Sequence, residues 1–485
     1  MKLIQNIYYR LSSSLIIALL GFATSVIVIR IFGVEIVGMI SYYMSIFGMI
    51  SCLCDLGLSS ALTKFISEKK FHENDLISAY FALKIVLLIL FIVLSLIVIQ
   101  NSNEHFDHKL LSIIFFTILL GNSLRSPLIS ICIAKRYFKI VSNAEVFSNI
   151  ITSVYTIVIC IFFQNIYLLA IKMFLLYFFE IIFIFFYMDR KSTFNFVFPD
   201  IQLIKKFITF AFPLALTAFV SKIMSHTDSL IIGYLIGMKE LGFYEIAKRL
   251  FAPFEMIIKP VTTTLYPEIL RKMVSNKKFF YNDFKELVHL LTCIGAFLTL
   301  FIIFLSEPFV KILYGPENLR AATIFVFFSG ICITKLFFNP YHHLVLGLEF
   351  QYIYPYITII SSIIRVTGYL LIIPQIVNNC QVGAIAIPLV NTFTCFFPDG
   401  LVIWYKIRSQ YNKTHILETI VKICTPLIFI LFVGYYFHYN LWLFPFAIVL
   451  FIIIQIQLKI ITKSKMEYIF QPFIQFLSNN FFILG

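Results

Sequence analysis

Apolar segments of about 20 residues recur along the whole chain and are separated by short polar connections. A helix of about that length crosses the hydrocarbon core of a bilayer and satisfies its own backbone hydrogen bonds there. Charged residues make up only 13% of the 485 residues, whereas soluble domains contain about 25%. The pattern predicts an all-α polytopic membrane protein, because the strands of a membrane barrel would be shorter and would alternate in polarity.

The apolar segments predict about 14 transmembrane helices, arranged as two six-helix bundles followed by two further helices. We expect spans at 11–32, 37–63, 76–99, 110–134, 142–163, 166–188, 207–236, 240–268, 286–305, 321–346, 352–374, 382–405, 416–437 and 441–458. The expected domains are an N-terminal bundle over 1–190, a cytoplasmic linker over 191–206, a C-terminal bundle over 207–408, and an accessory helix pair with a cytoplasmic tail over 409–485. The first apolar run lacks a small-residue cleavage motif, so we expect it to remain as a span rather than to be a cleaved signal peptide.

Basic residues are distributed unequally between the two sides of this predicted topology. Of the 38 Lys and Arg residues, 23 fall in connections on one side and 4 in connections on the other. Because cytoplasmic loops carry the excess of Lys and Arg, both termini are expected in the cytoplasm. The same bias explains most of the net charge of +14 without a nucleic-acid partner.

A glycine pattern repeats across the two halves. Gly33 and Gly38 recur 204 residues later as Gly237 and Gly242, each time in the short outer turn between two predicted spans. Six spans separate the two copies, and an even number preserves their orientation. The pattern therefore predicts a parallel internal repeat, with the halves related by rotation about the membrane normal.

Eleven basic residues fall within the predicted spans, where an unpaired charge costs several kcal/mol. Lys172 and Lys422 lie near span ends and are expected to snorkel to the interface. Glu245 and Glu255 each precede a basic residue by four positions and are expected to pair with it along the helix. The nine basic residues predicted to contact the phosphates or sugars of an anionic substrate are Arg30, Lys84, Arg125, Lys222, Lys248, Arg249, Lys259, Lys335 and Arg365.

Six of those nine have no acid three or four positions away on their own helix: Arg30, Lys84, Arg125, Lys222, Lys335 and Arg365. Acids elsewhere can still neutralise some of them across helices, and Asp55, Glu180 and Asp399 are candidates for this. Snorkelling is an alternative for Arg30, which lies near the outer end of its span.

The seventh and eighth predicted spans carry wide polar faces, which are typical of the wall of a wet cavity or, alternatively, of an interhelical salt-bridge seam. His226 and Asp228 share the face of the seventh span with Lys222 and Ser225. Both can change their protonation state, so we predict them as ion-coupling residues. Asp228 with a Ser225 oxygen could instead help to hold Na⁺, or Asp228 could simply neutralise a neighbouring base.

Catalytic signatures are absent from the sequence. There is no P-loop, nucleophile elbow or zinc-ligand spacing, so neither an enzyme nor a metal or cofactor site is expected. The nine cysteines show no CxxC or Cys/His pattern and are expected to be small buried hydrophobes. The predicted outer loops are too short for an external catalytic domain, which argues against a glycosyltransferase or polymerase.

Motif residues lie in both halves, in a specific order and spacing. They are Arg30, Gly33, Gly38, Asp55, Gly57, Leu58 and Ala61 in the first half, then Pro213, Asp228, Gly233, Gly237, Leu241, Gly242, Tyr244, Ala247, Arg249 and Pro267, with Leu313, Tyr314 and Gly315 before the tenth span. Over residues 10–405 the chain resembles bacterial polysaccharide repeat-unit flippases of the O-antigen type. These form the Wzx-like branch of the multidrug/oligosaccharidyl-lipid/polysaccharide exporter superfamily.

This resemblance implies two six-helix bundles around a central cavity that opens to one side of the bacterial inner membrane at a time. It implies a substrate of oligosaccharide linked to undecaprenyl pyrophosphate, moved from the cytoplasmic to the outer leaflet, and a polysaccharide polymerase and a chain-length regulator as partners. The cations suit this substrate, because Arg grips phosphate bidentately. Alternatives are a peptidoglycan-precursor (lipid II) flippase, a multidrug or cation antiporter of the same superfamily, and a non-transporting scaffold.

Overall fold

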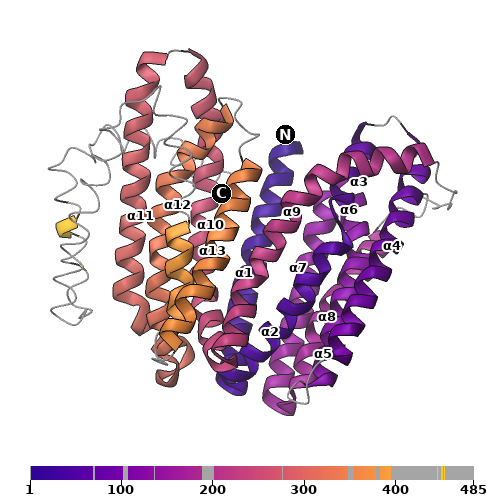
Figure 1. Ribbon diagram of the computed structural model, residues 1–485, viewed down its shortest axis with the longest axis horizontal. Helices are drawn as coiled ribbons and strands as arrows, with labels where there is room; N and C mark the ends of the chain where they lie inside the picture. The colour runs from indigo at the N-terminus through magenta and orange to yellow at the C-terminus, as the bar shows by residue number, and fades with distance from the viewer. Residues whose placement is uncertain are drawn as a thin grey trace, which may run out of the picture. The chain divides into compact units, whose positions relative to one another are not determined.

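The computed structural model describes residues 2–68, 71–101, 107–135, 137–187, 201–275, 277–347, 354–377, 383–394 and a few positions between 445 and 453 (Figure 1). Its long helices are α1 (Lys2–Phe32), α2 (Val34–Ile50), α3 (Leu58–Glu68), α4 (Glu73–Gln100), α5 (His108–Leu120), α6 (Ser126–Ala134), α7 (Phe138–Val158), α8 (Ile166–Tyr187), α9 (Ile201–Leu235), α10 (Met238–Ser275), α11 (Lys277–Tyr314), α12 (Arg320–Gly347) and α13 (Tyr354–Val377). Short turns η1 (Ser51–Cys54), η2 (Gly121–Arg125), η3 (Ile159–Phe163), η4 (Pro316–Asn318) and η6 (Gly383–Ile385) complete the order.

Within these residues, eight helical segments are long and apolar enough to cross a membrane. The predicted all-α polytopic class is therefore confirmed. The predicted spans 416–437 and most of 441–458 lie outside the described residues, and the described part of 382–405 ends at residue 394. The total of fourteen spans stays a prediction.

Two compact units divide the chain. Unit 1 contains Met1–Arg249, Leu313–Asn318 and Val366–Ala384, and unit 2 contains Leu250–Ile312, Leu319–Arg365 and Ile385–Gly485. The helices α10, α11 and α13 each contribute to both units. The predicted domain limits at 190 and 207 stay predictions.

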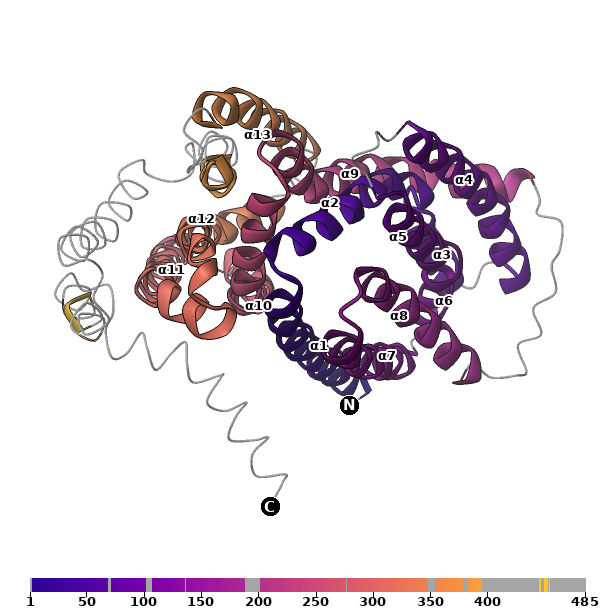
Figure 2. The same cartoon turned by 90° about the horizontal axis from the view of Figure 1, so that it is seen from below.

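A closed ring of helices lies within unit 1. Helix α1 packs on α2, α2 on α5, α5 on α8, α8 on α7, and α7 returns to α1. Figure 2 looks along these helices and shows the ring. Helix α9 packs against α2, α3 and α4, and Phe65 of α3 and Phe207 of α9 meet with ring centroids 4.9 Å apart. This packing fixes the side chains that face the inside of the ring.

The span predicted as one helix over 37–63 is broken, which corrects that prediction. Helix α2 ends at Ile50, η1 follows, and the chain then passes through Leu56 at φ 38° and Gly57 at φ 77° before α3 begins. Left-handed backbone at a non-glycine residue is rare and needs support from its surroundings. Here the Asp55 carboxylate accepts hydrogen bonds from Ser59 Oγ at 2.5 Å and Lys84 Nζ at 3.1 Å.

The repeated glycines meet one another in unit 1. A Cβ atom on Gly38 of α2 would collide with the Met238 carbonyl oxygen, and a Cβ atom on Gly242 of α10 would collide with the Val34 carbonyl oxygen. These two contacts are reciprocal at the 204-residue spacing, because 34 corresponds to 238 and 38 to 242. Gly33 and Gly237 both adopt positive φ, at 81° and 129°. The two copies of the pattern therefore occupy equivalent positions, as the repeat predicts.

Unit 2 has its own aromatic core. Phe251 of α10 stacks on Phe328 of α12 with ring centroids 5.3 Å apart. Gly295 of α11 lets that helix approach the backbone of α12, since a Cβ atom there would lie 3.0 Å from the Cys332 carbonyl oxygen. The Thr299 hydroxyl donates to the Ser329 carbonyl oxygen at 3.0 Å across the same contact. The sequence therefore builds this contact from small and hydroxyl side chains, as is common between membrane helices.

Candidate functional site

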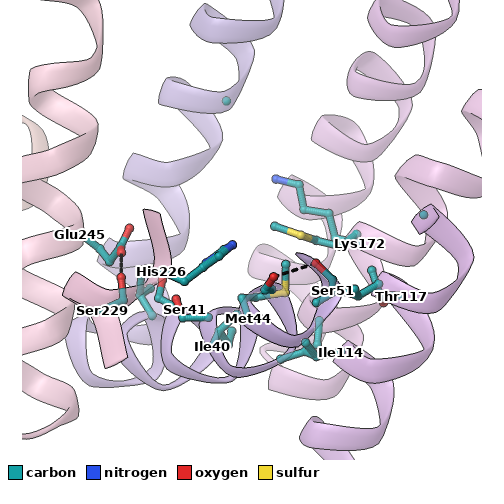
Figure 3. A pocket seen from close by; sticks show the side chains of 18 of the residues that line it. Ile40, Ser41, Met44, Ser51, Ile114, Thr117, Lys172, His226, Ser229 and Glu245 are labelled. Carbon is teal, nitrogen blue, oxygen red and sulfur yellow. Dashed lines mark hydrogen bonds between the residues drawn. The ribbon is translucent and has the colours of Figure 1, made fainter. Parts of the chain in front are cut away.

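A cavity of about 740 Å³ lies within unit 1. Its wall is formed by α1, α2, α5, η2, α8, α9 and the start of α10, so it occupies the inside of the helix ring. The volume is in the range of about 300–1,000 Å³ that is usual for ligand pockets. Figure 3 shows His226 and Lys172 pointing into it from different helices.

The wall is strongly basic. Its basic residues are Arg125, Lys172, Lys222, Lys248 and Arg249. Glu245 is the only acidic residue among the described lining residues. A cavity lined by one sign of charge within low-dielectric walls concentrates ions of the opposite sign. The wall therefore favours anions over cations.

Three of these cations have no carboxylate at ion-pair distance within the described part of the chain. Lys222 Nζ donates to the Ser51 carbonyl oxygen at 3.4 Å, and Lys172 Nζ donates to Thr24 Oγ1 at 3.5 Å. Arg249 on α10 also lines the cavity without a carboxylate partner there. Because unpaired charge in a membrane is costly, such groups are typical of hydrated or ligand-binding surfaces. We call Lys172, Lys222 and Arg249 the open cations.

Arg125 lines the cavity but is held by carboxylates. Arg125 is the last residue of the π-helical turn η2, and its side chain points toward α8. Its Nε lies 2.7 Å from Glu180 Oε2. A guanidinium nitrogen of Arg125 also lies 4.0 Å from Glu145, which pairs with Arg10 at 2.6 Å. The guanidinium carbon is 5.2 Å from the centre of the Tyr177 ring. The sequence did not establish which basic residue Glu180 pairs with, and the structure pairs it with Arg125.

Lys248 lies near Glu245, which also accepts a hydrogen bond from Ser229. Its Nζ lies 3.9 Å from Glu245 Oε1, and the same oxygen accepts a hydrogen bond from Ser229 Oγ at 3.1 Å. The predicted pairing of Glu245 with Arg249 is wrong, since Glu245 turns toward Lys248 and α9 instead. The change leaves Arg249 without the neutralising partner expected for it.

The two residues predicted for ion coupling occupy different places. The His226 imidazole lines the cavity and lies over Gly48, where a Cβ atom would come within 2.6 Å of Nε2. Asp228 is not among the lining residues. Its carboxylate accepts hydrogen bonds from Tyr244 at 2.9 Å and Tyr369 at 2.8 Å. The polar face of α9 is therefore divided between the cavity and a tyrosine cluster.

Lys84 and Lys335, both predicted to contact substrate, are ion-paired. Lys84 is fully buried, and its Nζ lies 3.1 Å from Asp55 Oδ1 in unit 1. Lys335 lies 2.5 Å from Glu255 Oε1 in unit 2. Glu255 thus reaches α12. Its predicted pair with Lys259 stays a prediction, because the Lys259 side chain is outside what the structure describes. Neither lysine lines the cavity.

Three further predicted residues lie elsewhere in the fold. Arg30 donates from Nε to the Leu313 carbonyl oxygen at 2.7 Å. Arg365 is on α13, and its Nε is buried without a hydrogen-bond partner in the described structure. Lys259 is on α10, but its side chain is outside what the structure describes. Of the nine cations predicted for substrate contact, four line the cavity: Arg125, Lys222, Lys248 and Arg249.

Lys172 is the lining residue that the sequence interpretation missed. It was expected to snorkel from a span end, but it is six residues beyond the start of α8, which is about 9 Å along the helix. This distance from the helix end could have indicated that Lys172 does not snorkel to the interface. Its position in the cavity wall makes it equivalent to the other open cations.

Hydroxyl and amide side chains complete the wall. They include Thr24, Ser25, Ser41, Ser45, Ser51, Thr117, Asn122, Ser126, Ser225 and Ser229. Such groups both donate and accept hydrogen bonds, which suits the hydroxyl groups of sugars. The expected polar wall on the seventh span is present at Ser225 and Ser229.

Comparison with known proteins places these features in a family. A family model described as polysaccharide biosynthesis protein matches residues 3–273. The teichuronic acid biosynthesis protein TuaB of Bacillus subtilis is 24% identical over 242 residues, which are 50% of this chain and 49% of that protein. An uncharacterized membrane protein in the cps region of Klebsiella pneumoniae is 24% identical over 330 residues, or 65% of each chain. The chain thus spans about half the length of the first relative and 65% of the second.

Solved structures share the fold. The lipid II flippase MurJ in an inward closed conformation matches with a TM-score of 0.70 and 17% identity, covering 96% of this chain and 100% of that chain. An inward-facing multidrug resistance MATE family transporter of the MOP superfamily matches with a TM-score of 0.56 and 16% identity, covering 83% and 99%. At 16–17% sequence identity, this similarity shows a shared fold alone.

Proposed function

Because the chain belongs to the polysaccharide biosynthesis protein family, we propose that it is a flippase for oligosaccharide linked to undecaprenyl pyrophosphate. The proposed direction is from the cytoplasmic to the outer leaflet of the bacterial inner membrane. The observation that supports it most is the group of open cations, Lys172, Lys222 and Arg249, in the cavity wall. The MOP transporter fold is consistent with alternating access.

The chemistry of the substrate matches the cavity in two respects. Pyrophosphate carries its charge on oxygens that guanidinium and ammonium groups bind well, and carrying it unaided through about 30 Å of hydrocarbon is prohibitive. Sugar hydroxyls can be hydrogen-bonded by the Ser and Thr side chains of the wall. A multidrug exporter for organic cations fits less well, because the wall is basic rather than acidic.

Transport against a gradient needs an energy source, and the sequence has no ATP-binding motif. We therefore propose coupling to an ion gradient, with His226 and Asp228 as candidate residues. His226 is favoured by its place in the cavity. Asp228 would have to act through its hydrogen bonds to Tyr244 and Tyr369. If Asp228 carries the coupling, Asp228→Asn should abolish the response of the flipping rate to a pH or Na⁺ gradient. Downhill flipping should continue in this variant.

The proposed topology places both termini in the cytoplasm, on the strength of the unequal distribution of basic residues. Reporter fusions at Gly485 and near Asn103 should then report opposite sides of the membrane. A result on the same side would contradict the topology. A polysaccharide polymerase and a chain-length regulator are the proposed protein partners.

Reconstitution tests the function directly. Purified protein in vesicles should translocate a fluorescent undecaprenyl-pyrophosphate oligosaccharide faster than empty vesicles, as measured by loss of fluorescence to an added quencher. The lipid II pentapeptide precursor, assayed in parallel, should be moved more slowly. Equal or faster movement of lipid II would favour the peptidoglycan-precursor alternative, and no movement of either lipid would contradict a flippase.

A further inference from the structure

Glu180 on α8 is a buried acid to which the proposed function gives no role. Its side chain is 1% exposed, and it does not line the cavity. Oε2 accepts a hydrogen bond from Arg125 Nε at 2.7 Å. Oε1 is buried and has no hydrogen-bond partner among the described residues. Within that part of the chain, Arg125 is therefore the ion-pair partner on which this carboxylate depends.

Arg125 faces two surroundings at once. Its side chain is 29% exposed and lines the cavity, although its Nε is bonded to Glu180. The Tyr177 ring lies under the guanidinium, with the ring centre 5.2 Å from the guanidinium carbon. Gly121 at the start of η2 leaves room for this ring, since a Cβ atom there would lie 2.8 Å from it. Because π-helical turns are frequent at functional sites and a guanidinium has five N–H donors, Arg125 is placed to bind an anion in the cavity.

A second acid near Arg125 shows why Glu180 is special. Glu145 on α7 has Oε1 4.0 Å from Arg125 Nη2, but its Oε2 lies 2.6 Å from Arg10 Nη1. If the Arg125 guanidinium turned to a ligand, Glu145 would keep Arg10 as its partner. Glu180 would keep no ion-pair partner within the described residues.

Other titratable groups on α8 and on the elements packed against it do not replace Arg125. They are His108 and Lys109 of α5, Lys139 and Tyr155 of α7, Cys160 of η3, and Tyr167, Lys172, Tyr177 and Tyr187 of α8. In the described structure none of these groups forms an ion pair or a hydrogen bond with Glu180. The charge of Glu180 is therefore tied to the position of Arg125.

We propose that Arg125 exchanges Glu180 for the pyrophosphate of the substrate, and that Glu180 is protonated while the substrate is bound. The inference rests on the proposed function, since it takes a pyrophosphate-linked lipid as the ligand. A buried carboxylate without a partner is costly, and a second anion on the same guanidinium repels it. One proton from the solvent adds to a Glu180 carboxylate oxygen, and the phosphate charge replaces the carboxylate charge beside Arg125. Glu180 is thus a positioning residue that acts through Arg125.

Isothermal titration calorimetry measures this proton directly. The full chain in detergent is titrated near neutral pH with a short-chain polyprenyl pyrophosphoryl disaccharide, in buffers that differ in their heat of ionisation. The dependence of the binding heat on the buffer gives the number of protons taken up, and we expect about one per ligand. Because the complex holds the additional proton, the affinity should fall by about tenfold for each unit by which the pH rises.

Glu180→Gln should abolish both effects, because the amide resembles the protonated carboxyl group. Its affinity should not depend on pH and should exceed that of the wild type near neutral pH by about tenfold, since no carboxylate competes for Arg125. A purely structural role of Glu180 would change the unfolding midpoint and leave the proton uptake unchanged. If Glu180→Gln does not fold, the double variant with Arg125→Gln removes both charges of the pair and should likewise take up no proton.

Two further variants serve as controls for the assignment. Glu145→Gln is the matched control, since Glu145 is also near Arg125 but has Arg10 as its partner. His226→Gln removes the titratable imidazole of the cavity wall. Both variants should still take up about one proton for each ligand bound.

The outcomes separate this inference from the proposed function. Binding without proton uptake in the wild type would overturn the exchange and leave the flippase proposal standing. Proton uptake that persists in Glu180→Gln, or that disappears in Glu145→Gln or His226→Gln, would overturn its assignment to Glu180. If the pyrophosphoryl disaccharide binds no more tightly than polyprenol without pyrophosphate, the proposed function itself is wrong.

Discussion

Two lysines of unit 1 lie within predicted spans but in opposite surroundings. Lys84 on α4 is fully buried, with Nζ 3.1 Å from Asp55 Oδ1. Lys222 on α9 faces the cavity, and its Nζ reaches a backbone carbonyl oxygen at 3.4 Å. The comparison separates cations that hold helices together from cations that are open to a ligand. Pairing, rather than depth in the membrane, is what distinguishes them.

The largest expected effect is on stability, from breaking the buried pair. Lys84→Met leaves the Asp55 carboxylate uncompensated beside the break between α2 and α3, which should cost about 3 kcal/mol. We give the lower end of the usual range because Asp55 keeps 30% of its side chain exposed. Thermal unfolding in detergent measures the loss. The double variant with Asp55→Asn should recover most of it, and an unchanged midpoint in Lys84→Met would remove the distinction between the two lysines.

Arg125 should combine both behaviours, since it lines the cavity and also pairs with Glu180, which is 1% exposed. Arg125→Ala should lower stability by about 2–3 kcal/mol, because a buried carboxylate loses its partner. It should also slow transport. Adding Glu180→Gln should restore stability but not transport, as measured by unfolding and flipping assays on the same preparations. Recovery of both properties would make Arg125 purely structural.

The open cations should affect binding and leave stability nearly unchanged. Lys172→Gln, Lys222→Gln or Arg249→Gln should each weaken binding of a pyrophosphate-linked sugar by about 10- to 100-fold, as for the loss of one charge-assisted hydrogen bond. Arg249→Lys should lose less than Arg249→Gln, since charge remains while bidentate geometry is lost. A fall in the unfolding midpoint as large as that of Lys84→Met would place these residues in the structural class.

The smallest expected effect is at the Asp228 cluster. Tyr369→Phe removes one hydroxyl donor from the carboxylate and should cost about 1–2 kcal/mol in stability. Tyr244→Phe removes a second hydroxyl donor and provides the matched comparison. Affinity for the pyrophosphate-linked sugar should change little in either, because Asp228 does not line the cavity. A tenfold loss of affinity would instead connect this cluster to the binding site.

The sequence predicted the architecture because hydrophobic length and the position of glycines are local properties. The equivalent placement of Gly38 and Gly242 was predicted from their spacing, whereas their reciprocal contacts were not. The break at Leu56 and Gly57 could not, since the surrounding apolar run resembles a continuous span. The Asp55 side chain next to this break hydrogen-bonds Lys84, which is distant in the sequence.

The site was predicted only in part, for a related reason. Periodicity on one helix identifies a polar face, but the partner of each charge belongs to another helix. Glu245 had Arg249 four positions onward and nevertheless turned to Lys248, and Glu255 reaches Lys335 on another helix. Lys172 was missed because Glu180 is the one other charged residue of α8, so no wide polar face marked it. Cross-helix packing decides which cations remain open, and one sequence does not reveal it.

The most direct test of the central claim is the flipping rate of a fluorescent undecaprenyl-pyrophosphate oligosaccharide in vesicles containing the Lys172→Gln, Lys222→Gln, Arg249→Gln triple variant. We predict a rate indistinguishable from empty vesicles, with an unfolding midpoint close to that of the wild-type protein. A triple variant that is folded and flips the lipid at the wild-type rate would contradict the claim that these three cations carry the anionic substrate.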